Sequence, residues 1–494
     1  MPRPRRSRAR WLAVALWLAA PVPGRAADVT DVASSGDKQN PFDFNLRVGY
    51  ESTTRTGAVK REHEGDPGQT AVNVLKDLVY KRTSDRMTLR AEIGIWHDLS
   101  FSAELPLSLS DSTTLSYDQR LGAACVFGGP GANCVNADNS LSTSNQTTFN
   151  HVDWNTARGN YGDPSYLIPF GGYDAVGSAQ AGRSVGFNPG SSSVFRGADR
   201  GGSAGNLLDT INLALSYAVL SQRRDDTKPT WVLALEYRLS IGNVMAFDRA
   251  HPDANHGVAD GLDHLIARTA ISRRYRYLEP YALFWFDYPF VNRGDTLFFD
   301  LGANAKNSAP QMSAGTRFGL EAVPYELPAR AIKVAIDASL RLSARFDGRG
   351  YSEIWEALAS SPALACDPAW NPSCSAASKD PATGAPWNGV TAYQGRAFSG
   401  ITVIDNFASL GGELAVVVQA SRWFRLRAYL FYQRDQGHLV TIDDVGRPGS
   451  GGGRVGSPAE YNPAYRPVIN EVGRRYRVDD VDTLTAGVWG QAMF

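Results

Sequence analysis

Long hydrophobic runs and any excess of charge are missing from this chain of 494 residues. Its 50 basic residues balance its 50 acidic ones, so the formal net charge is zero. That balance gives no indication of nucleic-acid binding or of electrostatic adhesion to anionic lipid. The apolar run at residues 11–20 is well short of the roughly 20 residues that a membrane-spanning helix needs. We therefore expect no transmembrane helix and no nucleic-acid partner.

Cysteine is also rare, and the four that are present form two local pairs. In an oxidising compartment, an even number of closely spaced cysteines favours disulfides over free thiols. Neither pair has the CxxC spacing or the nearby histidines of a zinc site. We expect two loop disulfides, Cys125–Cys134 and Cys366–Cys374, and no metal.

The start of the chain has the pattern of a secretory signal. Arginines crowd residues 3–10 ahead of the apolar run, and prolines and small residues follow that run. We predict a signal peptide at residues 1–26, with cleavage after Ala26 or Ala27. A twin-arginine signal is the alternative, but the residues after Arg5 and Arg6 lack the apolar character that such a signal requires.

Strict alternation of apolar and polar residues recurs along the rest of the chain. Because successive side chains of a strand point to opposite faces, this period of two predicts β-strands. The expected strands are 42–50, 87–95, 101–109, 211–219, 231–241, 265–271, 278–288, 316–322, 332–346, 408–418, 424–432 and 481–494. The fold class is therefore all-β.

Short and long connections between these strands alternate without exception. Short turns fall near residues 98, 225, 275, 327 and 422, and long connections at 53–70, 112–205, 243–262, 292–311, 347–404 and 437–480. Short periplasmic turns and long extracellular loops are typical of outer-membrane barrels. The pattern predicts a single transmembrane antiparallel up-and-down β-barrel of about 12 strands over residues 42–494, after a short periplasmic segment at 27–41.

One segment leaves the strand count open. Residues 72–80 are apolar at even positions, whereas residues 87–95 are apolar at odd ones. We interpret residues 72–95 as one long strand with a phase shift or bulge around 81–85. The alternative is two additional strands and a total of 14.

The chain ends in a further alternating strand. Leu484, Ala486, Val488, Gly490 and Ala492 lead to an aromatic C-terminal residue, Phe494. This ending resembles the assembly signal that the barrel-assembly machinery of Gram-negative envelopes reads. The resemblance implies an exported outer-membrane protein whose partners are that machinery and outer-membrane lipid. Closure of the sheet would also remove every strand edge, which hydrocarbon does not tolerate.

The polar face of the predicted strands carries charge of both signs together with aromatic residues. By parity the candidates for lining the lumen are Arg47, Arg90, Glu92, Glu104, Glu236, Arg238, Arg268, Glu279, Tyr281, Trp285, Asp287, Arg317, Glu321, Lys333, Asp337, Arg341, Glu413, Arg425, Arg427 and Tyr429. One interpretation is a network of ion pairs that stiffens the wall, and the other is a ladder of charges along a permeation path. The balance of signs argues against strong ion selectivity.

Two stretches, residues 90–107 and 268–280, look like hairpins of outer-membrane transporters for aromatic or fatty compounds. The resemblance implies a channel or passive transporter for small solutes, apolar or aromatic ones included. Fatty-acid-type transporters carry an N-terminal hatch, but only about residues 28–41 precede the first strand here. We therefore expect any gate to come from loops or lumen side chains. The alternative function is a structural or surface-interaction barrel that acts through its extracellular loops.

The histidines argue against a serine-based catalytic site. All seven lie in or beside loops and turns, away from any strand serine that they could activate. Residues 248–264 hold the densest set of potential metal ligands, but their spacing matches no known coordination loop. We expect no enzyme, no cofactor and no metal.

Overall fold

The computed structural model describes the barrel wall and part of the connections. The described residues are 27–36, 42–64, 72–118, 193–196, 200–202, 207–246, 257–294, 296–300, 307, 309–359, 398–448, 460, 462 and 464–494. The predicted signal peptide, both predicted disulfides and the histidine-bearing stretch 248–256 lie outside these residues. No helix of the described residues is long and apolar enough to span a membrane.

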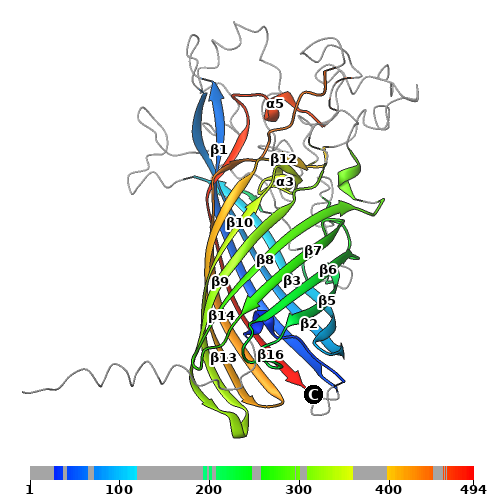
Figure 1. The fold of residues 1–494 in the computed structure, drawn as a ribbon. Coiled ribbons are helices and arrows are strands. Elements are labelled where there is room, and N and C mark those ends of the chain that lie inside the picture. Colours follow the sequence, from blue (N-terminus) through cyan, green and yellow to red (C-terminus); the bar gives the residue numbers. More distant parts are fainter. Residues whose placement is uncertain are drawn as a thin grey trace, which may run out of the picture.

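Twelve antiparallel strands follow one another around a closed barrel (Figure 1). They are β1 (Phe44–Glu64), β2 (Val72–Trp96), β3 (Leu99–Tyr117), β5 (Thr210–Leu220), β6 (Thr230–Ser240), β7 (Leu262–Ser272), β8 (Leu278–Val291), β9 (Ser313–Leu327), β10 (Ile332–Arg345), β13 (Phe407–Ser421), β14 (Phe424–Asp435) and β16 (Tyr476–Met493). Each strand pairs with its neighbour, and β16 pairs with β1. The prediction of a 12-stranded up-and-down barrel is confirmed, and the 14-stranded alternative is wrong.

The closing seam joins the two ends of the barrel sequence. Asn45 is opposite Met493, and the register continues to Arg61 opposite Tyr476. At the seam's end the backbone N–H of Phe494 donates to the carbonyl of Phe44 at 2.8 Å, and the N–H of Phe44 donates back at 3.1 Å. The two phenyl rings lie 6.0 Å apart between their centroids. The C-terminal aromatic residue is therefore part of the closure itself.

The outer face of the wall is apolar over most strands. Leu414 and Leu430, opposite each other on β13 and β14, are 57% and 51% exposed. Leu46, Leu235, Phe286 and other large apolar side chains are exposed in the same way. A soluble protein rarely exposes so large an apolar surface. The band matches the lipid-facing surface of a membrane barrel.

All connections predicted to be short are short, and they gather at one end of the barrel, which we call the turn end. The opposite end, with the long connections, is called the loop end. At the turn end Arg223 reaches Asp98 of the neighbouring turn at 2.9 Å, and Arg224 pairs with the same carboxylate. Strand β1 reaches further toward the loop end than predicted, since it runs to Glu64 through most of the predicted connection 53–70, whereas β2 begins at Val72 as predicted.

The expected long strand over residues 72–95 is confirmed as β2, but its side chains do not change sides around residues 81–85. Tyr80 and Arg82 point to the same side as Arg90, because Tyr80 is buried inside the loop end, Arg82 pairs with Asp111 at 2.6 Å, and Arg90 lies 3.9 Å from Glu104. The side of β2 that faces inward is therefore unchanged from Leu78 to Glu92. Nearer the loop end Val59 is opposite Leu78 while Lys60 is opposite Lys76, so Asp77 is an extra residue of β2. What changes along β2 is the environment of its inward side chains, which is a polar lumen around Arg90 and an apolar core around Tyr80.

The irregularity nearest to residues 81–85 lies in the neighbouring strand β3. Asp85 is opposite Ser110 while Arg86 is opposite Ser108, so Leu109 is an extra residue. A one-residue bulge reverses the side to which the following side chains point. Leu115, beyond the bulge, is buried at the loop end.

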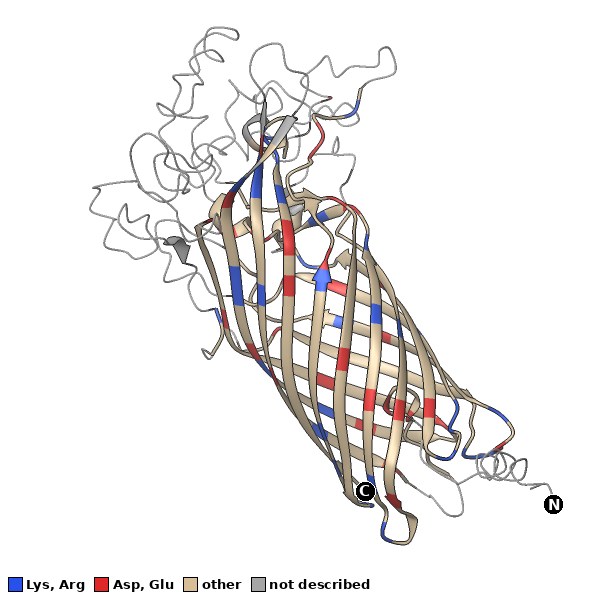
Figure 2. Cartoon of the chain, turned by 90° about the vertical axis from the view of Figure 1, so that its left-hand side faces the viewer, with Lys and Arg blue, Asp and Glu red and all other residues tan. Residues whose placement is uncertain are grey.

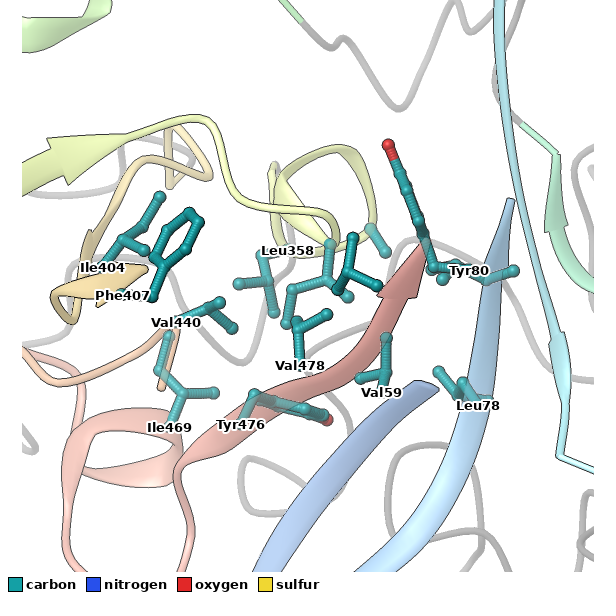
Figure 3. Close-up of a cluster of buried hydrophobic side chains, with 14 of the residues drawn as sticks. Val59, Leu78, Tyr80, Leu358, Ile404, Phe407, Val440, Ile469, Tyr476 and Val478 are labelled. Carbon is teal, nitrogen blue, oxygen red and sulfur yellow. The ribbon is translucent and has the colours of Figure 1, made fainter. Parts of the chain in front are cut away.

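An apolar core that the sequence analysis did not predict lies at the loop end. It includes Val59, Leu78, Leu115 and Val478 from the wall and Leu358 from a connection (Figure 3). The connecting elements that gather there are β4 (Ser193–Arg196), β11 (Gly348–Gly350), α3 (Trp355–Leu358), β12 (Thr402–Ile404), β15 (His438–Leu439) and α5 (Pro467–Asn470). Two short 3-10 helices, η4 (Leu297–Asp300) and η5 (Pro328–Arg330), complete the connections. Long loops therefore fold partly over the mouth (Figure 1).

Deletion of residues 491–494 is expected to prevent closure. The deletion removes the pairs that β16 makes with Asn45, Leu46 and Arg47 on β1 and with Phe424 and Arg425 on β14. The barrel would then keep unpaired edges, which lipid does not tolerate. We expect almost complete loss of the fast-migrating folded form on unboiled gels. Phe494→Tyr, which keeps the ring, serves as the control, and an undiminished folded band after the deletion contradicts this role of the seam.

Candidate functional site

A cavity of about 640 Å³ lies inside the barrel. Its charged lining consists of six arginines and four acidic residues, namely Arg238, Arg268, Arg317, Arg341, Arg345, Arg427, Asp28, Glu51, Asp287 and Glu413. Four aromatic side chains, Trp285, Tyr429, Phe431 and Trp489, share the lining. Charged positions occur on strands all around the wall (Figure 2). A volume of this size suits a small-molecule site.

Nine of the 20 residues proposed from the sequence line this cavity. They are Arg238, Arg268, Trp285, Asp287, Arg317, Arg341, Glu413, Arg427 and Tyr429. The cavity also has lining residues that the proposed set missed, including Glu51 and Arg345. Glu51 lies four residues beyond Arg47, and Arg345 lies four residues beyond Arg341, so each points to the same inner side of its strand as the proposed residue. Extending the alternation along these two strands would therefore have found them.

The densest ion-pair cluster joins four strands, β9, β10, β13 and β14. Arg427 lies 2.7 Å from Asp337 and 2.5 Å from Glu413. Arg317 lies 3.3 Å and 2.9 Å from the same two carboxylates. Tyr281 donates its hydroxyl hydrogen to Asp337 at 2.8 Å. Two cations and two anions therefore balance one another here, and the cluster ties neighbouring strands together.

The remaining proposed residues make smaller clusters. Arg268 and Arg238 both pair with Glu236, at 2.8 Å and 2.7 Å. Arg90 lies between Glu92 and Glu104, at 3.8 Å and 3.9 Å. The other contacts are Lys333 with Glu321, Asp287 with His264, Arg47 with Asp28, Arg425 with Asp31 and Glu279 with Ser272. Of the proposed charged residues, Arg341 and Glu279 make no ion pair with any described residue.

Aromatic rings lie flat against the inner wall because glycines make room for them. Gly315 is opposite Trp285, and a Cβ at Gly315 would lie 2.1 Å from the indole ring. Gly487 is opposite Tyr429, and a Cβ there would lie 2.4 Å from the phenol ring. Any larger residue would push these rings into the lumen. The glycines therefore help to keep the cavity open.

Arg341 stands apart from the ion-pair clusters. Its guanidinium carbon lies 4.7 Å from the ring centre of Trp285 and 5.8 Å from that of Phe431. The side chain is exposed to the cavity that it lines. Arg345, four residues further along β10, lies over the Phe407 ring at 5.9 Å and likewise makes no ion pair with a described residue. These two cations contact aromatic rings in place of carboxylates.

The first described residues lie inside the turn end of the barrel. The 3-10 helix η1 (Asp28–Thr30) is part of this N-terminal segment, residues 27–36 (Figure 1). Arg425 lies 3.1 Å from Asp31, Thr30 and Ser272 share a hydrogen bond of 2.7 Å, and the Ala33 N–H donates to Glu92 at 3.3 Å. These partners belong to β14, β7 and β2, so the segment contacts several parts of the inner wall.

The segment is short, as expected, and its acidic side chains face arginines of the inner wall. Although burial raises the pKa of Asp28, the nearby guanidinium groups of Arg47 and Arg427 lower it to well below its ordinary value. Asp28 therefore stays ionised in mild acid. The sequence signal that could have suggested this placement is the pair Asp28 and Asp31, opposite inward arginines at the starts of β1 and β14.

No family model and no curated protein sequence match this chain. Among solved structures, it is similar to an outer-membrane channel from Pseudomonas putida F1, with 8% identity, 91% of this chain and 96% of that chain covered, and a TM-score of 0.34. A monoaromatic hydrocarbon channel, TodX, gives 10% identity, coverage of 92% and 91%, and a TM-score of 0.27. An anion-selective porin from Comamonas acidovorans gives 9% identity, coverage of 91% and 100%, and a TM-score of 0.21. Similarity at this level carries no functional inference.

Replacement of Arg427 by methionine is expected to destabilise the barrel. The side chains of Arg427 and Asp337 are each 5% exposed, so the change leaves buried Asp337 and partly buried Glu413 with only Arg317 to neutralise them. Breaking a buried ion pair in this way typically costs about 3–5 kcal/mol. Urea unfolding in detergent or lipid, followed by tryptophan fluorescence, measures the loss.

Arg341→Met is the matched control for that experiment, since it also removes a guanidinium group from the inner wall but breaks no ion pair with a described residue. Its free energy of unfolding is expected to lie within about 1 kcal/mol of the unmodified protein. Equal losses in the two variants would contradict the structural role of the cluster.

Proposed function

We propose that this protein is an outer-membrane channel or passive transporter for small solutes. The observation that carries the proposal is a polar cavity of about 640 Å³ enclosed by a barrel whose outer surface is apolar. A barrel of intermediate strand number can be filled by its side chains or can hold a solute. Here glycines beneath Trp285 and Tyr429 leave room along the wall, which supports the second possibility.

The location proposed for it is the outer membrane of a Gram-negative bacterium. The exposed apolar belt needs lipid around it. Export by a signal peptide at residues 1–26 and assembly through the C-terminal strand ending in Phe494 fit this location. In that orientation the turn end faces the periplasm and the loop end faces the outside.

The size of the solute is limited by both ends of the barrel. The N-terminal segment lies within the turn end, where it is held by Glu279, Arg425 and Glu92. The apolar core around Leu358 and Val478 lies at the loop end. A solute that reaches the cavity must pass both, which favours molecules of about the size of a single sugar or aromatic ring over oligomers.

The inner wall is proposed to bind and conduct and to catalyse no reaction. His264 is held between Asp287 at 2.8 Å and Asp260 at 3.6 Å. His438 stacks on Phe407, with ring centres 3.9 Å apart. These contacts give both rings a structural role.

Reconstitution into planar bilayers tests the channel. We expect discrete conductance steps from the purified protein and from a variant that lacks residues 121–190, because that deletion leaves β3, β4 and Arg200 in place. The protein with residues 491–494 deleted provides the control, because it should insert no closed barrel. Absence of conductance from both closed forms would contradict the channel and favour a barrel that acts through its loops.

A further inference from the structure

We propose that the cavity binds a small aromatic carboxylate at Arg341, between Trp285 and Phe431. This inference rests on the proposed channel function and names the class of solute that the cavity would favour. The site combines a guanidinium group that has no carboxylate partner among the described residues with two aromatic rings beside it.

The charge of the cavity lining favours an anion. Six arginines face four acidic residues there. Four of the arginines already make ion pairs, since Arg238 and Arg268 share Glu236, and Arg317 and Arg427 share Asp337 and Glu413. Arg341 and Arg345 remain, and both lie on the same side of β10. The two cavity arginines that make no ion pair with a described residue therefore lie on one part of the wall.

A carboxylate fits the free guanidinium group better than other small anions of the same charge. The planar guanidinium presents parallel N–H donors, which match the two oxygens of a carboxylate. Stacking between Trp285 and Phe431 limits the freedom of the Arg341 side chain, so less rotational entropy is lost when a ligand binds.

The aromatic part of the ligand follows from the surroundings of Arg341. Trp285 lies flat over Gly315, and Phe431 and Trp489 also line the cavity. A ring next to these side chains can pack face to face or edge to face, which adds binding energy beyond simple burial. A purely aliphatic acid would lack this contribution, and a neutral aromatic would leave the guanidinium group unpaired.

Two measurements on the full-length protein test the site, with benzoate as the probe. Binding to the detergent-solubilised protein is measured by calorimetry, and entry is measured by swelling of liposomes that contain the protein. We expect benzoate to bind about tenfold more tightly than benzamide, because the amide lacks the charge that strengthens a hydrogen bond to arginine. We also expect benzoate to bind more tightly than cyclohexanecarboxylate.

The Arg341→Met variant should weaken benzoate binding about tenfold, and Trp285→Leu should remove the preference over cyclohexanecarboxylate. Arg422→Met is the matched control, because Arg422 also lies over an indole ring, that of Trp423 at 4.3 Å, but in the β13–β14 turn. Its benzoate affinity should not change. Heat-modifiability on gels verifies that each variant is folded.

The outcomes separate this inference from the channel function. Swelling with sugars but equal affinity for benzoate and benzamide overturns the carboxylate site and leaves the channel intact. Equal affinity for benzoate and cyclohexanecarboxylate overturns its aromatic part. An Arg341→Met variant with unchanged benzoate affinity overturns the assignment of the site to Arg341. Absence of swelling with every solute, despite tight benzoate binding, overturns the channel alone.

A second inference comes from a different observation, at the turn end. The side chain of Glu279 is completely buried, and the backbone nitrogen of Ala27 lies 2.5 Å from its Oε1 atom. Ser272 donates a hydrogen bond to the same oxygen at 2.8 Å, while Oε2 has no hydrogen-bond partner among the residues that the structure describes. A buried carboxylate without a cation is costly. No arginine or lysine forms an ion pair with Glu279 among the described residues.

We infer that the proposed signal peptide is removed between Ala26 and Ala27 and that the new amino group pairs with Glu279. Hydrolysis of this peptide bond by water leaves a carboxylate on Ala26 and an ammonium group on Ala27. The ammonium would take the place of the present N–H donor and neutralise Glu279. Export and processing would therefore complete the contact that holds the N-terminal segment inside the barrel.

Mass spectrometry of the purified mature protein tests the cleavage position, and an N-terminus other than Ala27 overturns the inference. Amine-reactive labelling then tests the contact. We expect Ala27 in the folded protein to react at least tenfold more slowly than in Glu279→Gln, where the ammonium has lost its partner. Asp225→Asn, in an exposed turn, is the control and should leave Ala27 protected.

If Glu279→Gln fails to fold, a second variant keeps Glu279 and adds one glycine before Ala27. That glycine moves the ammonium away from Glu279, so its labelling should also be at least tenfold faster. Equal labelling rates in the folded protein and this variant would overturn the contact.

Discussion

Closure of the sheet is the constraint on which the rest of this structure depends. A strand in contact with lipid has no water to satisfy its backbone groups, so every N–H and C=O group must find a partner in a neighbouring strand. The pairing of β1 with β16 meets this condition for the first and last strands of the barrel. Once the ring is closed, its two faces are in different surroundings, and each strand alternates between lipid-facing apolar residues and polar residues that face inward.

The interior then has to accommodate many charges in little space. Most are paired, as in the cluster of Arg427, Arg317, Asp337 and Glu413, which joins four strands. Glycines opposite Trp285 and Tyr429 let those rings lie against the wall. The result is a wall stiffened by ion pairs around a cavity in which Arg341 meets aromatic rings in place of a carboxylate. The two interpretations of the charged face, a stiffening network and a solute path, therefore apply to different residues of one surface.

The alternation of residues predicted the wall well and its extensions poorly. Parity identified the inward side of β9, β10, β13 and β14 because one face of these strands is in lipid along most of their length. It misled us at residues 72–80, where the inward side chains Leu78 and Tyr80 are apolar because they enter the core at the loop end. Leu109 was missed as the bulged residue because a bulge depends on the register between two strands and not on the composition of either.

The sequence by itself determined the all-β class, a count of about twelve strands and, over most of the wall, the side of each strand that faces lipid. These follow from period-two alternation and from connection lengths, which are local properties of the chain. Only the tertiary structure decided that residues 27–36 lie within the barrel and that connecting elements such as α3 form an apolar core at its loop end. It also decided which inward charges are paired. Those features depend on contacts between residues hundreds of positions apart, such as Ala27 and Glu279, and such contacts leave no periodic signal.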